Sequence, residues 1–328
     1  MQAIIVSQPG GPEVLTLAEV PTPQPGPGDV LIAVEAAGVC RADALQRAGR
    51  YPPPQGANPI LGLECAGTIC AVGEGVPDAR LGERVCALCN GGAYAQFVAV
   101  PNGQVLPLPE GWSCIEAASL PENAFTVFDN LLTRAALQGG EILLVHAAGG
   151  GIGTTALMFA RALGVRVIAT AGTQEKRQAC LDLGAEIALD SRAPGLETQV
   201  MAATGGHGVD VILETLGGDS IARDLGCIAL DGRIACISTM LGARVELDIG
   251  ALLARRASIF GSSLRPRTAT QKAAIAAGLR ERIWPHLERR ETIRPVVDTT
   301  FPLSQAADAH RRLEANLHIG KIILRAPR

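Results

Sequence analysis

The chain has 328 residues, of which 48 % are hydrophobic, 19 % are charged and only 3 % are aromatic. Its 29 lysine and arginine residues nearly balance 32 acidic residues, which gives a formal net charge of −3. This length and apolar content predict about two folded domains and exclude a disordered chain. The balanced charge and the shortage of aromatics argue against a nucleic-acid or anionic-membrane partner, which would require a basic field or stacking side chains.

The sequence predicts neither export nor a membrane anchor. The start, Met1–Gly11, has no basic segment and only a short apolar run, unlike a signal peptide. No apolar stretch approaches the ~18 residues that a membrane span needs. The nine cysteines are odd in number and scattered, which indicates reduced thiols in the cytoplasm. Cys86 and Cys89 have the spacing of half a zinc site, but no second pair completes it, so we interpret them as strand-end residues.

The first part of the chain predicts short strands that glycine and proline interrupt. Strands are expected at residues 1–7, 14–20, 30–36, 67–72, 84–87 and 94–100. The proline-rich segment 21–28 has no flanking aromatics and is interpreted as a surface loop. This pattern predicts an irregular β-barrel domain over residues 1–120.

From residue 121 onward, apolar strands alternate with helices. Strands are expected at 141–148, 165–171, 186–189, 209–215, 232–238 and 258–264, with helices at 152–163, 174–183, 197–203, 220–230 and 249–256. Six such repeats predict an α/β domain with a doubly wound parallel sheet over residues 121–267. Residues 268–328, with helices at 271–288 and 303–315, an extended segment at 296–301 and a strand at 321–325, are expected to return to the first domain.

The segment His146–Gly153 predicts a dinucleotide-binding loop. Against the pattern G-x-G-x-x-G, Ala148 takes the first position, Gly150 the second and Gly153 the third. Gly150 leaves room for backbone N–H groups to reach a pyrophosphate, and Gly153 lets the helix pack against the strand. The motif follows a strand, opens a helix and begins the βα repeats, so it is far more specific than an isolated glycine pattern.

The end of the second strand in this domain predicts which dinucleotide is bound. It lacks the carboxylate that would accept a hydrogen bond from the ribose 2′-OH of NAD. Lys176 and Arg177 lie on the first turn of the next helix, where a 2′-phosphate would be bound. We therefore predict NADPH, with a hydroxyl from Thr173 and a cation from Lys176. A solvated helix start, with Glu175 partly neutralising the bases, is the alternative.

Seven segments that occur in order along the chain point to one family. They are Gly38–Asp43, Gly49–Pro54, Leu61–Gly67, His146–Gly153, Thr170–Lys176, Ser262–Arg267 and Asn316–Lys321. With them, the chain resembles the zinc-independent quinone oxidoreductases of the medium-chain dehydrogenase/reductase superfamily, and it looks most like the tumour-suppressor-inducible type. The resemblance implies a chaperonin-10-like catalytic domain, a Rossmann domain, a cleft between them and a homodimer.

The same segments do not provide the zinc ligands of the superfamily's alcohol dehydrogenases. There, the segment matching Gly38–Asp43 supplies a cysteine, another supplies a histidine, and a third ligand follows. Cys40 is present, but Leu63 stands at the histidine position and Ala124 and Phe125 stand at the third. One ligand of three cannot hold a catalytic zinc, so we predict no metal. Several zinc-free relatives carry asparagine in place of Cys40, which leaves this residue either a packed side chain or a reactive thiol.

Without zinc, hydride must go to an acceptor that needs little electrophilic help. Quinones and related activated enones fit, because reduction of a quinone gives an aromatic hydroquinone and the proton can come from water. Tyr51 lies in the family's substrate loop and is the predicted catalytic residue, donating a hydrogen bond to the developing oxyanion. A phenol packed in a proline-rich loop is the alternative. No histidine is expected to be catalytic.

The resemblance also implies a set of cofactor-binding residues. Those near the nicotinamide half are Cys40, Asp43 and Thr126, and those lining the pyrophosphate are Ala148, Gly150, Gly151, Ile152 and Gly153. Those holding the adenosine phosphate are Gly172, Thr173 and Lys176, and Ser191 replaces a tyrosine that relatives carry near the adenosine. Strand-end residues complete the set: Thr215, Gly217, Ser238, Thr239, Met240, Ser263 and Arg265. Arg265 as a simple surface base is the alternative.

Two other functions remain open. An NADPH-dependent 2-enoyl-thioester reductase has the same fold, and it would use Tyr51 as an acid and Arg41, Arg47 and Arg50 to hold the nucleotide end of CoA. The other is a weakly catalytic NADPH-binding protein with a structural or regulatory role. RNA binding by such a protein is disfavoured by the low lysine count and the lack of stacking aromatics.

Overall fold

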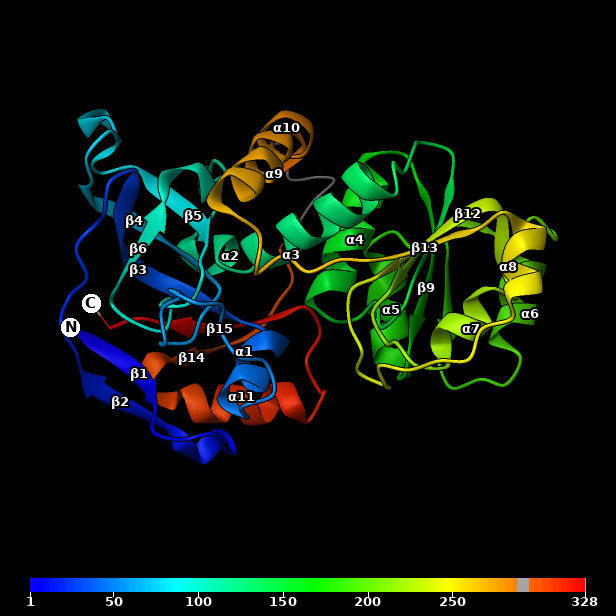
Figure 1. Ribbon diagram of the computed structural model, residues 1–328, viewed down its shortest axis with the longest axis horizontal. Helices are drawn as coiled ribbons and strands as arrows, with labels where there is room; N and C mark the ends of the chain where they lie inside the picture. Colours follow the sequence, from blue (N-terminus) through cyan, green and yellow to red (C-terminus); the bar gives the residue numbers. More distant parts are fainter. Residues whose placement is uncertain (288–294, 328) are drawn as a thin grey trace. The chain divides into compact units, whose positions relative to one another are not determined.

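Segments far apart in the sequence build the first of two folded units in the computed structural model, which describes residues 1–287 and 295–327 (Figure 1). This first unit comprises residues 1–125, 264–287 and 295–327, and the second comprises residues 126–263. The boundaries expected from the sequence, 120/121 and 267/268, lie a few residues away from these. No described helix is long and apolar enough to cross a membrane.

A seven-stranded sheet forms the centre of the first unit. Its strand order is β14-β15-β3-β4-β5-β7, and β6 pairs with β3 off this path. The bounds are β3 (Asp29–Val39), β4 (Glu64–Val72), β5 (Arg84–Leu88), β6 (Phe97–Pro101), β7 (Val105–Pro107), β14 (Val297–Pro302) and β15 (Lys321–Arg325). β15 lies between β14, to which it is parallel, and β3, to which it is antiparallel, so the returning segment supplies one internal strand and one edge strand of the sheet (Figure 1).

Smaller elements surround this sheet. A hairpin pairs β1 (Gln2–Val6) with β2 (Leu15–Glu19), and the helices are α1 (Arg41–Arg47), α2 (Cys114–Ala117), α9 (Ala269–Arg282), α10 (Trp284–Leu287) and α11 (Ala306–Glu314). α11 buries Ala306, Ala309, His310 and Leu313, the spacing of one helix face. The helix expected at 271–288 is thus two helices, and its last residue, Glu288, lies outside the described residues.

The second unit has the predicted doubly wound parallel sheet. Its order is β10-β9-β8-β11-β12-β13, formed by β8 (Ile142–Val145), β9 (Arg166–Ala171), β10 (Ile187–Asp190), β11 (Val209–Glu214), β12 (Ile228–Cys236) and β13 (Ser258–Gly261). Helices α4 (Gly151–Ala162), α5 (Gln174–Asp182), α6 (Leu196–Ala203), α7 (Ser220–Asp224) and α8 (Ile249–Arg255) connect the strands. All four residues of β8 are buried, as expected for a strand covered on both faces. The carboxyl ends of these strands form the edge where ligands bind in such sheets.

One expected helix is wrong in length. The helix predicted for residues 220–230 ends at Asp224, and β12 begins at Ile228, inside it. Asp231 has a left-handed φ of 62°, and the pairing of β11 with β12 shifts register between Val209 and Val211. Pairing with β11 therefore overrides the local helical pattern, and the Asp231-Gly232 turn signal becomes an irregularity within a strand.

Candidate active site

The loop after β8 has the geometry of a phosphate cradle. A Cβ on Gly153 would lie 2.4 Å from Cα of Ala148, so glycine is what lets α4 pack against the end of β8. Gly150 is the N-cap of α4, and a Cβ there would meet only the carbonyl oxygen of Ala147, at 3.6 Å. Such a Cβ would fill the space through which a phosphate approaches the helix N-terminus. The residues Ala148, Gly150, Gly151, Ile152 and Gly153 thus lie together and fit a dinucleotide.

One cationic side chain lies beside Gly172, just after β9, and another lies beside Gly149 in the phosphate loop. A Cβ on Gly172 would be 3.2 Å from Nη2 of Arg192, and a Cβ on Gly149 would be 3.1 Å from three carbons of the Lys176 side chain. The hydroxyl of Thr173 caps α5 by accepting a hydrogen bond from the backbone N of Lys176 at 3.2 Å. Lys176 therefore lies against the phosphate loop. Arg192 is a cation that the sequence did not indicate, because it follows β10 and only the pairing of β10 with β9 brings it near Gly172.

Arg177 and Ser191 both donate hydrogen bonds to the backbone carbonyl of Ala171, at the end of β9. Arg177 forms an ion pair with Asp190, with 3.0 Å between Nη1 and Oδ2, and it also donates to the carbonyl of Ala171. Ser191 donates its backbone N–H to the same carbonyl at 3.2 Å, which extends the edge of β10. Of the two bases on the first turn of α5, Lys176 is therefore the one that faces the phosphate loop.

The predicted strand-end residues border the same edge of the sheet. Thr215 and Gly217 follow β11, and Ser238, Thr239 and Met240 follow β12. A Cβ on Gly217 would lie 2.8 Å from Cα of Thr239, so the two loops pack closely. Thr215 donates its hydroxyl to the carbonyl of His146 at 3.0 Å, which links its loop to the phosphate loop.

In the first unit, Asp43 is a fully buried acceptor. Its carboxylate accepts from the backbone N of Cys40 at 2.9 Å, from the backbone N of Gly62 at 3.0 Å and from the Tyr94 hydroxyl at 3.2 Å. Burial raises the pKa of Asp43 to about 6, although the backbone hydrogen bonds oppose the rise. Asp43 thus fixes the turn that carries Cys40.

A chain of buried polar groups continues from Tyr94. Its hydroxyl is 3.1 Å from Nε2 of His310, whose Nδ1 is 3.1 Å from Nη1 of Arg47. Burial, with Arg47 nearby, lowers the pKa of His310 to about 3, so the ring is neutral and its Nδ1 accepts from the guanidinium. Arg47 also pairs with Glu314 at 2.5 Å and is 2 % exposed. This arginine is therefore not available to hold CoA, which corrects one element of the thioester-reductase interpretation.

A buried ammonium group lies beside Cys40. Nζ of Lys321 is 3.2 Å from Cys40 Sγ and forms an ion pair with Glu64, whose other oxygen accepts from the backbone N of Glu122 at 2.9 Å. Burial opposes the charge on Lys321, but its anionic neighbours raise the pKa above its usual range. Burial likewise raises the pKa of the Cys40 thiol well above its usual value, so Cys40 is a protonated, hydrogen-bonded thiol.

The residues around Cys40 do not fit a zinc ion. Leu63 and Ala124, at the positions where the alcohol dehydrogenases would carry ligands, are buried apolar side chains. The ammonium of Lys321 already lies against the sulfur and would repel a second cation. Cys86 lies in the middle of β5 and not, as expected, at its end, whereas Cys89 directly follows the strand; both are free, buried thiols.

Tyr51 and Arg265, predicted from separate segments, lie together. The guanidinium carbon of Arg265 is 5.4 Å from the centroid of the Tyr51 ring, a cation–π contact. Arg265 is only 6 % exposed, so it is not a surface base, and none of its three guanidinium nitrogens has a hydrogen-bond partner among the described residues. Burial lowers the pKa of Arg265, while Tyr51 and Asp43 oppose the shift. Lys272 holds the backbone of Arg265 in place by donating to its carbonyl at 3.0 Å.

The remaining two predicted residues lie where the chain passes between units. Thr126 is buried on α3 (Pro121–Val127), and Ser263 is exposed after β13. The structure thus groups Cys40, Asp43, Tyr51 and Arg265 in the first unit and the phosphate-loop and strand-end residues in the second.

Comparison with known proteins assigns the class. The alcohol dehydrogenase GroES-like domain family matches residues 26–110, and the family described as zinc-binding dehydrogenase matches residues 151–277. The chain is 32 % identical to a quinone oxidoreductase of Rattus norvegicus over 99 % of this chain and 97 % of that protein. It also matches polyketide synthases of Mycobacterium tuberculosis, but spans only 15 % of their length.

Solved structures agree with this assignment. The quinone oxidoreductase of Escherichia coli complexed with NADPH is similar with a TM-score of 0.82 and 28 % identity, covering 99 % of this chain and 100 % of that one. CurK enoyl reductase is similar with a TM-score of 0.86 and 27 % identity, covering 99 % of both chains. A GroES-like unit joined to a Rossmann unit with a dinucleotide loop defines an oxidoreductase of the medium-chain dehydrogenase/reductase superfamily. Within it, the chain belongs to the quinone oxidoreductase family.

Proposed function

We propose that this protein is an NADPH-dependent reductase that transfers hydride to quinones without a metal. The observation that carries the proposal is the buried guanidinium of Arg265, unpaired among the described residues and in contact with the Tyr51 ring. A buried cation without a partner is costly, and an anion that develops beside it is correspondingly stabilised. The oxygen of a quinone acquires such a charge when hydride arrives.

Several features support NADPH as the cofactor. When bound, its nicotinamide supplies the hydride. The phosphate loop leaves space above Gly150, and Lys176 lies against this loop at Gly149. Arg192 lies beside Gly172, where a 2′-phosphate is expected. The E. coli quinone oxidoreductase was solved with NADPH, and the likeness covers nearly the whole of this chain.

The residues of the first unit would act on the acceptor. The hydroxyl of Tyr51 and the N–H groups of Arg265 donate to the acceptor oxygen, orienting it and stabilising its charge. Hydride and one proton convert a quinone to a hydroquinone, and that proton comes from water or from the Tyr51 hydroxyl, which water then reprotonates. No carbon atom of the acceptor needs an enzyme acid after hydride transfer.

The surroundings of Lys321 support reaction without zinc. A Lewis acid would polarise the acceptor carbonyl in a zinc dehydrogenase. Here the cation beside Cys40 is an ammonium that Glu64 already neutralises, and it is 5 % exposed. We infer that Lys321 fixes the local charge. We also infer that Arg265, which the resemblance to the family places among the cofactor-binding residues, supplies the cation for the acceptor instead.

The second candidate is reduction of a 2-enoyl thioester, which the likeness to CurK enoyl reductase favours. This reaction delivers hydride to Cβ and needs an acid for Cα. Tyr51 is then required as a proton donor, and the charge develops on the thioester oxygen, again beside Arg265. The two candidates differ in how strongly they depend on the tyrosine hydroxyl.

A substrate panel with two variants tests the proposal. NADPH oxidation is measured with an ortho-quinone, a para-quinone and an enoyl-CoA, for the wild type, Tyr51→Phe and Arg265→Gln. Arg265→Gln is expected to lower kcat/KM for the quinones about 100-fold, as for loss of an oxyanion donor, while the Kd for NADPH stays unchanged. The control is Arg256→Gln, which removes an exposed arginine paired with Asp231 and should have no effect.

Two results would contradict the proposal, and each would indicate a different alternative. A raised Kd for NADPH in Arg265→Gln would place that arginine at the cofactor and contradict the acceptor role. A large loss on Tyr51→Phe with enoyl-CoA, together with slow quinone turnover by the wild type, would favour the thioester reductase.

A further inference from the structure

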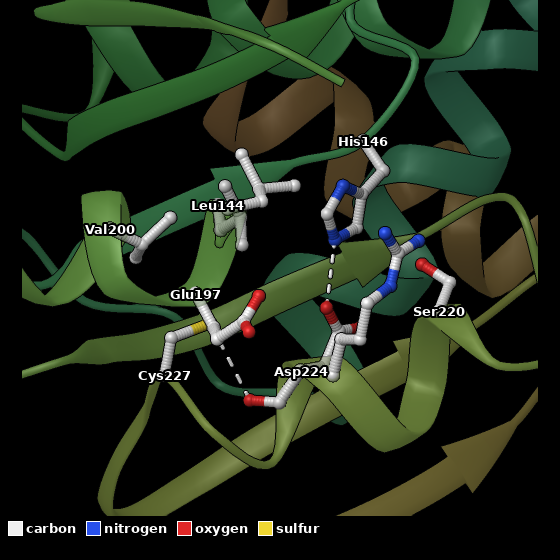
Figure 2. A pocket seen from close by; sticks show the side chains of 9 residues that line it. Leu144, His146, Glu197, Val200, Ser220, Asp224 and Cys227 are labelled. Carbon is white, nitrogen blue, oxygen red and sulfur yellow. Dashed lines mark hydrogen bonds and ion pairs between the residues drawn. The ribbon is translucent and has the colours of Figure 1, made fainter. Parts of the chain in front are cut away.

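A buried ionic cluster lies at the base of the cofactor loops of the second unit. Nε2 of His146 is 2.9 Å from Oδ1 of Asp224 and 3.8 Å from Oε2 of Glu214. None of the three residues is more than 2 % exposed. Figure 2 shows the imidazole of His146, at the end of β8, pointing toward Asp224 on α7.

His146 touches the other strand ends as well. Its Nδ1 is 3.0 Å from the hydroxyl oxygen of Thr170 on β9, next to the segment that contains Gly172. The backbone N of Ala148 donates to the carbonyl of Thr170 at 2.9 Å. Together with the bond from Thr215 to the His146 carbonyl, these contacts join the loops after β8, β9 and β11.

Glu214 shapes the third of these loops. Its Oε1 accepts from the backbone N of Leu216 and from that of Gly217, the latter at 2.8 Å. Its Oε2 accepts from the hydroxyl of Ser220 at 2.7 Å. The carboxylate thus fixes the turn after β11, and His146 links it to the loops after β8 and β9.

The cluster is not a ligand site of its own. The cavity beside it measures only about 10 Å³, roughly the space of a single water, so no organic ligand fits (Figure 2). His146, Glu214 and Asp224 are close enough to hold a metal ion. However, the carboxylate of Glu214 is already saturated by backbone and hydroxyl donors, and the imidazole bonds Asp224 directly.

The charges facing the imidazole favour its protonated form. Burial lowers the pKa of His146, but Asp224 and Glu214 outweigh this and raise it above its usual 6.5, with Arg223 opposing them. Glu197 of α6 also lines the cavity. The protonated ring donates from both nitrogens, to Thr170 and to Asp224, which fits the two distances.

We propose that His146 is a positioning residue for the dinucleotide, whose imidazole holds the loops after β8, β9 and β11 in the arrangement that receives NADPH. The inference rests on one part of the proposed function, namely that this protein binds NADPH. It does not depend on which acceptor is reduced. Cofactor binding is therefore measured without acceptor, so this proposal and the acceptor proposal can fail separately.

The test is His146→Asn, which keeps a polar side chain near Thr170 but removes the charge and the reach to Asp224. Titration calorimetry is expected to show the Kd for NADPH raised about tenfold, with kcat at saturating NADPH and the acceptor KM within twofold. The control is His207→Asn. His207 also pairs with an aspartate, Asp210 at 3.1 Å, but lies exposed at the opposite end of β11, and its loss should leave Kd unchanged.

A second variant and a pH series complete the test. Thr170→Val removes only the hydroxyl that lies 3.0 Å from Nδ1 of His146, and it should raise the Kd for NADPH severalfold. If His146→Asn does not fold, this variant tests the proposal in its place. In the wild type, the Kd should rise as pH increases through the raised pKa of His146, and His146→Asn should lack that rise. Wild-type Kd in both variants, folded by circular dichroism, would overturn the proposal, as would equal losses in Kd, kcat and acceptor KM.

Discussion

Lys321 shows how one buried charge can organise a site. Its ammonium balances Glu64 and lies against the thiol of Cys40, in a region that also contains the buried Asp43 and the half-buried Glu122. A cluster with so many acids is stable only if a fixed cation is present. Gly38 leaves the space that the Glu64 carboxylate occupies, since a Cβ at this position would lie 2.1 Å from Oε1 of Glu64.

Replacing this lysine should therefore destabilise the first unit. Lys321→Met keeps the length of the side chain but leaves Glu64 buried and unpaired, so the free energy of unfolding should fall by about 3–5 kcal/mol. Urea denaturation followed by tryptophan fluorescence reports this unit alone, because both tryptophans, Trp112 and Trp284, lie in it.

Two comparisons sharpen that measurement. Adding Glu64→Gln to Lys321→Met should recover most of the loss, since the uncompensated charge disappears. Arg311→Met, which breaks an exposed pair with Asp308, should cost less than about 1 kcal/mol. An unchanged urea midpoint for Lys321→Met would show that the buried pair contributes nothing.

The site was predictable in part from single residues. Gly150, Gly153 and Lys176 follow from local patterns, because a phosphate loop is built from one contiguous segment. The contact between Tyr51 and Arg265 was not predictable, although each residue was singled out, because the sequence does not say which loops meet. Of the hydrogen-bonded series from Asp43 through Tyr94 to His310, only Asp43 was singled out from the sequence. Its members come from three separate segments.

At the scale of elements, the two glycines of the phosphate loop have separable roles. Gly150→Ala should leave stability unchanged, since its backbone is extended and its Cβ would have only an ordinary contact. It should still weaken NADPH binding strongly, because the methyl group blocks the approach of the phosphate. Gly153→Ala should instead lower the free energy of unfolding by about 1–3 kcal/mol, because α4 must move off the end of β8.

Calorimetric unfolding and NADPH titration of both variants check this pair. Wild-type affinity in Gly150→Ala would show that the cofactor does not approach the helix N-terminus there. A stable Gly153→Ala would mean that the close packing of α4 on Ala148 can relax.

The strands of the second unit were the easiest elements to predict. The central strand β8 is a continuous apolar run, because it is covered on both faces, and glycines follow the ends of α4 and α5 at Gly164 and Gly184. The helix predicted over the first residues of β12 is wrong because these residues pair with β11 instead. The pairing crosses an irregularity that has the sequence of a turn.

At the scale of the whole molecule, the nine cysteines are all described and all free. Burial raises the pKa of most of them: Cys114, Cys180 and Cys236 to about 11, and Cys227 to about 12. Cys70 is the one cysteine classed as exposed. Since the thiolate is the reactive form, the folded protein should offer very little reactive thiol.

A thiol reagent such as dithionitrobenzoate should therefore label Cys70 first and the other cysteines only as the chain unfolds. The expected stoichiometry is one fast thiol per chain at pH 8, and Cys70→Ser should remove it. A fast reaction that survives Cys70→Ser would point first to Cys236, the half-buried cysteine, and would contradict the expectation that burial protects the other thiols.

The position of β15 has a consequence for how the chain folds during synthesis. The parallel sheet of the second unit is complete once residue 261 has been made, whereas the sheet of the first unit lacks an internal strand until residue 325. Domains usually fold in the order of synthesis. We expect the reverse order here, because β3 lacks its partner strand and Glu64 lacks its cation until β15, which contains Lys321, has been made.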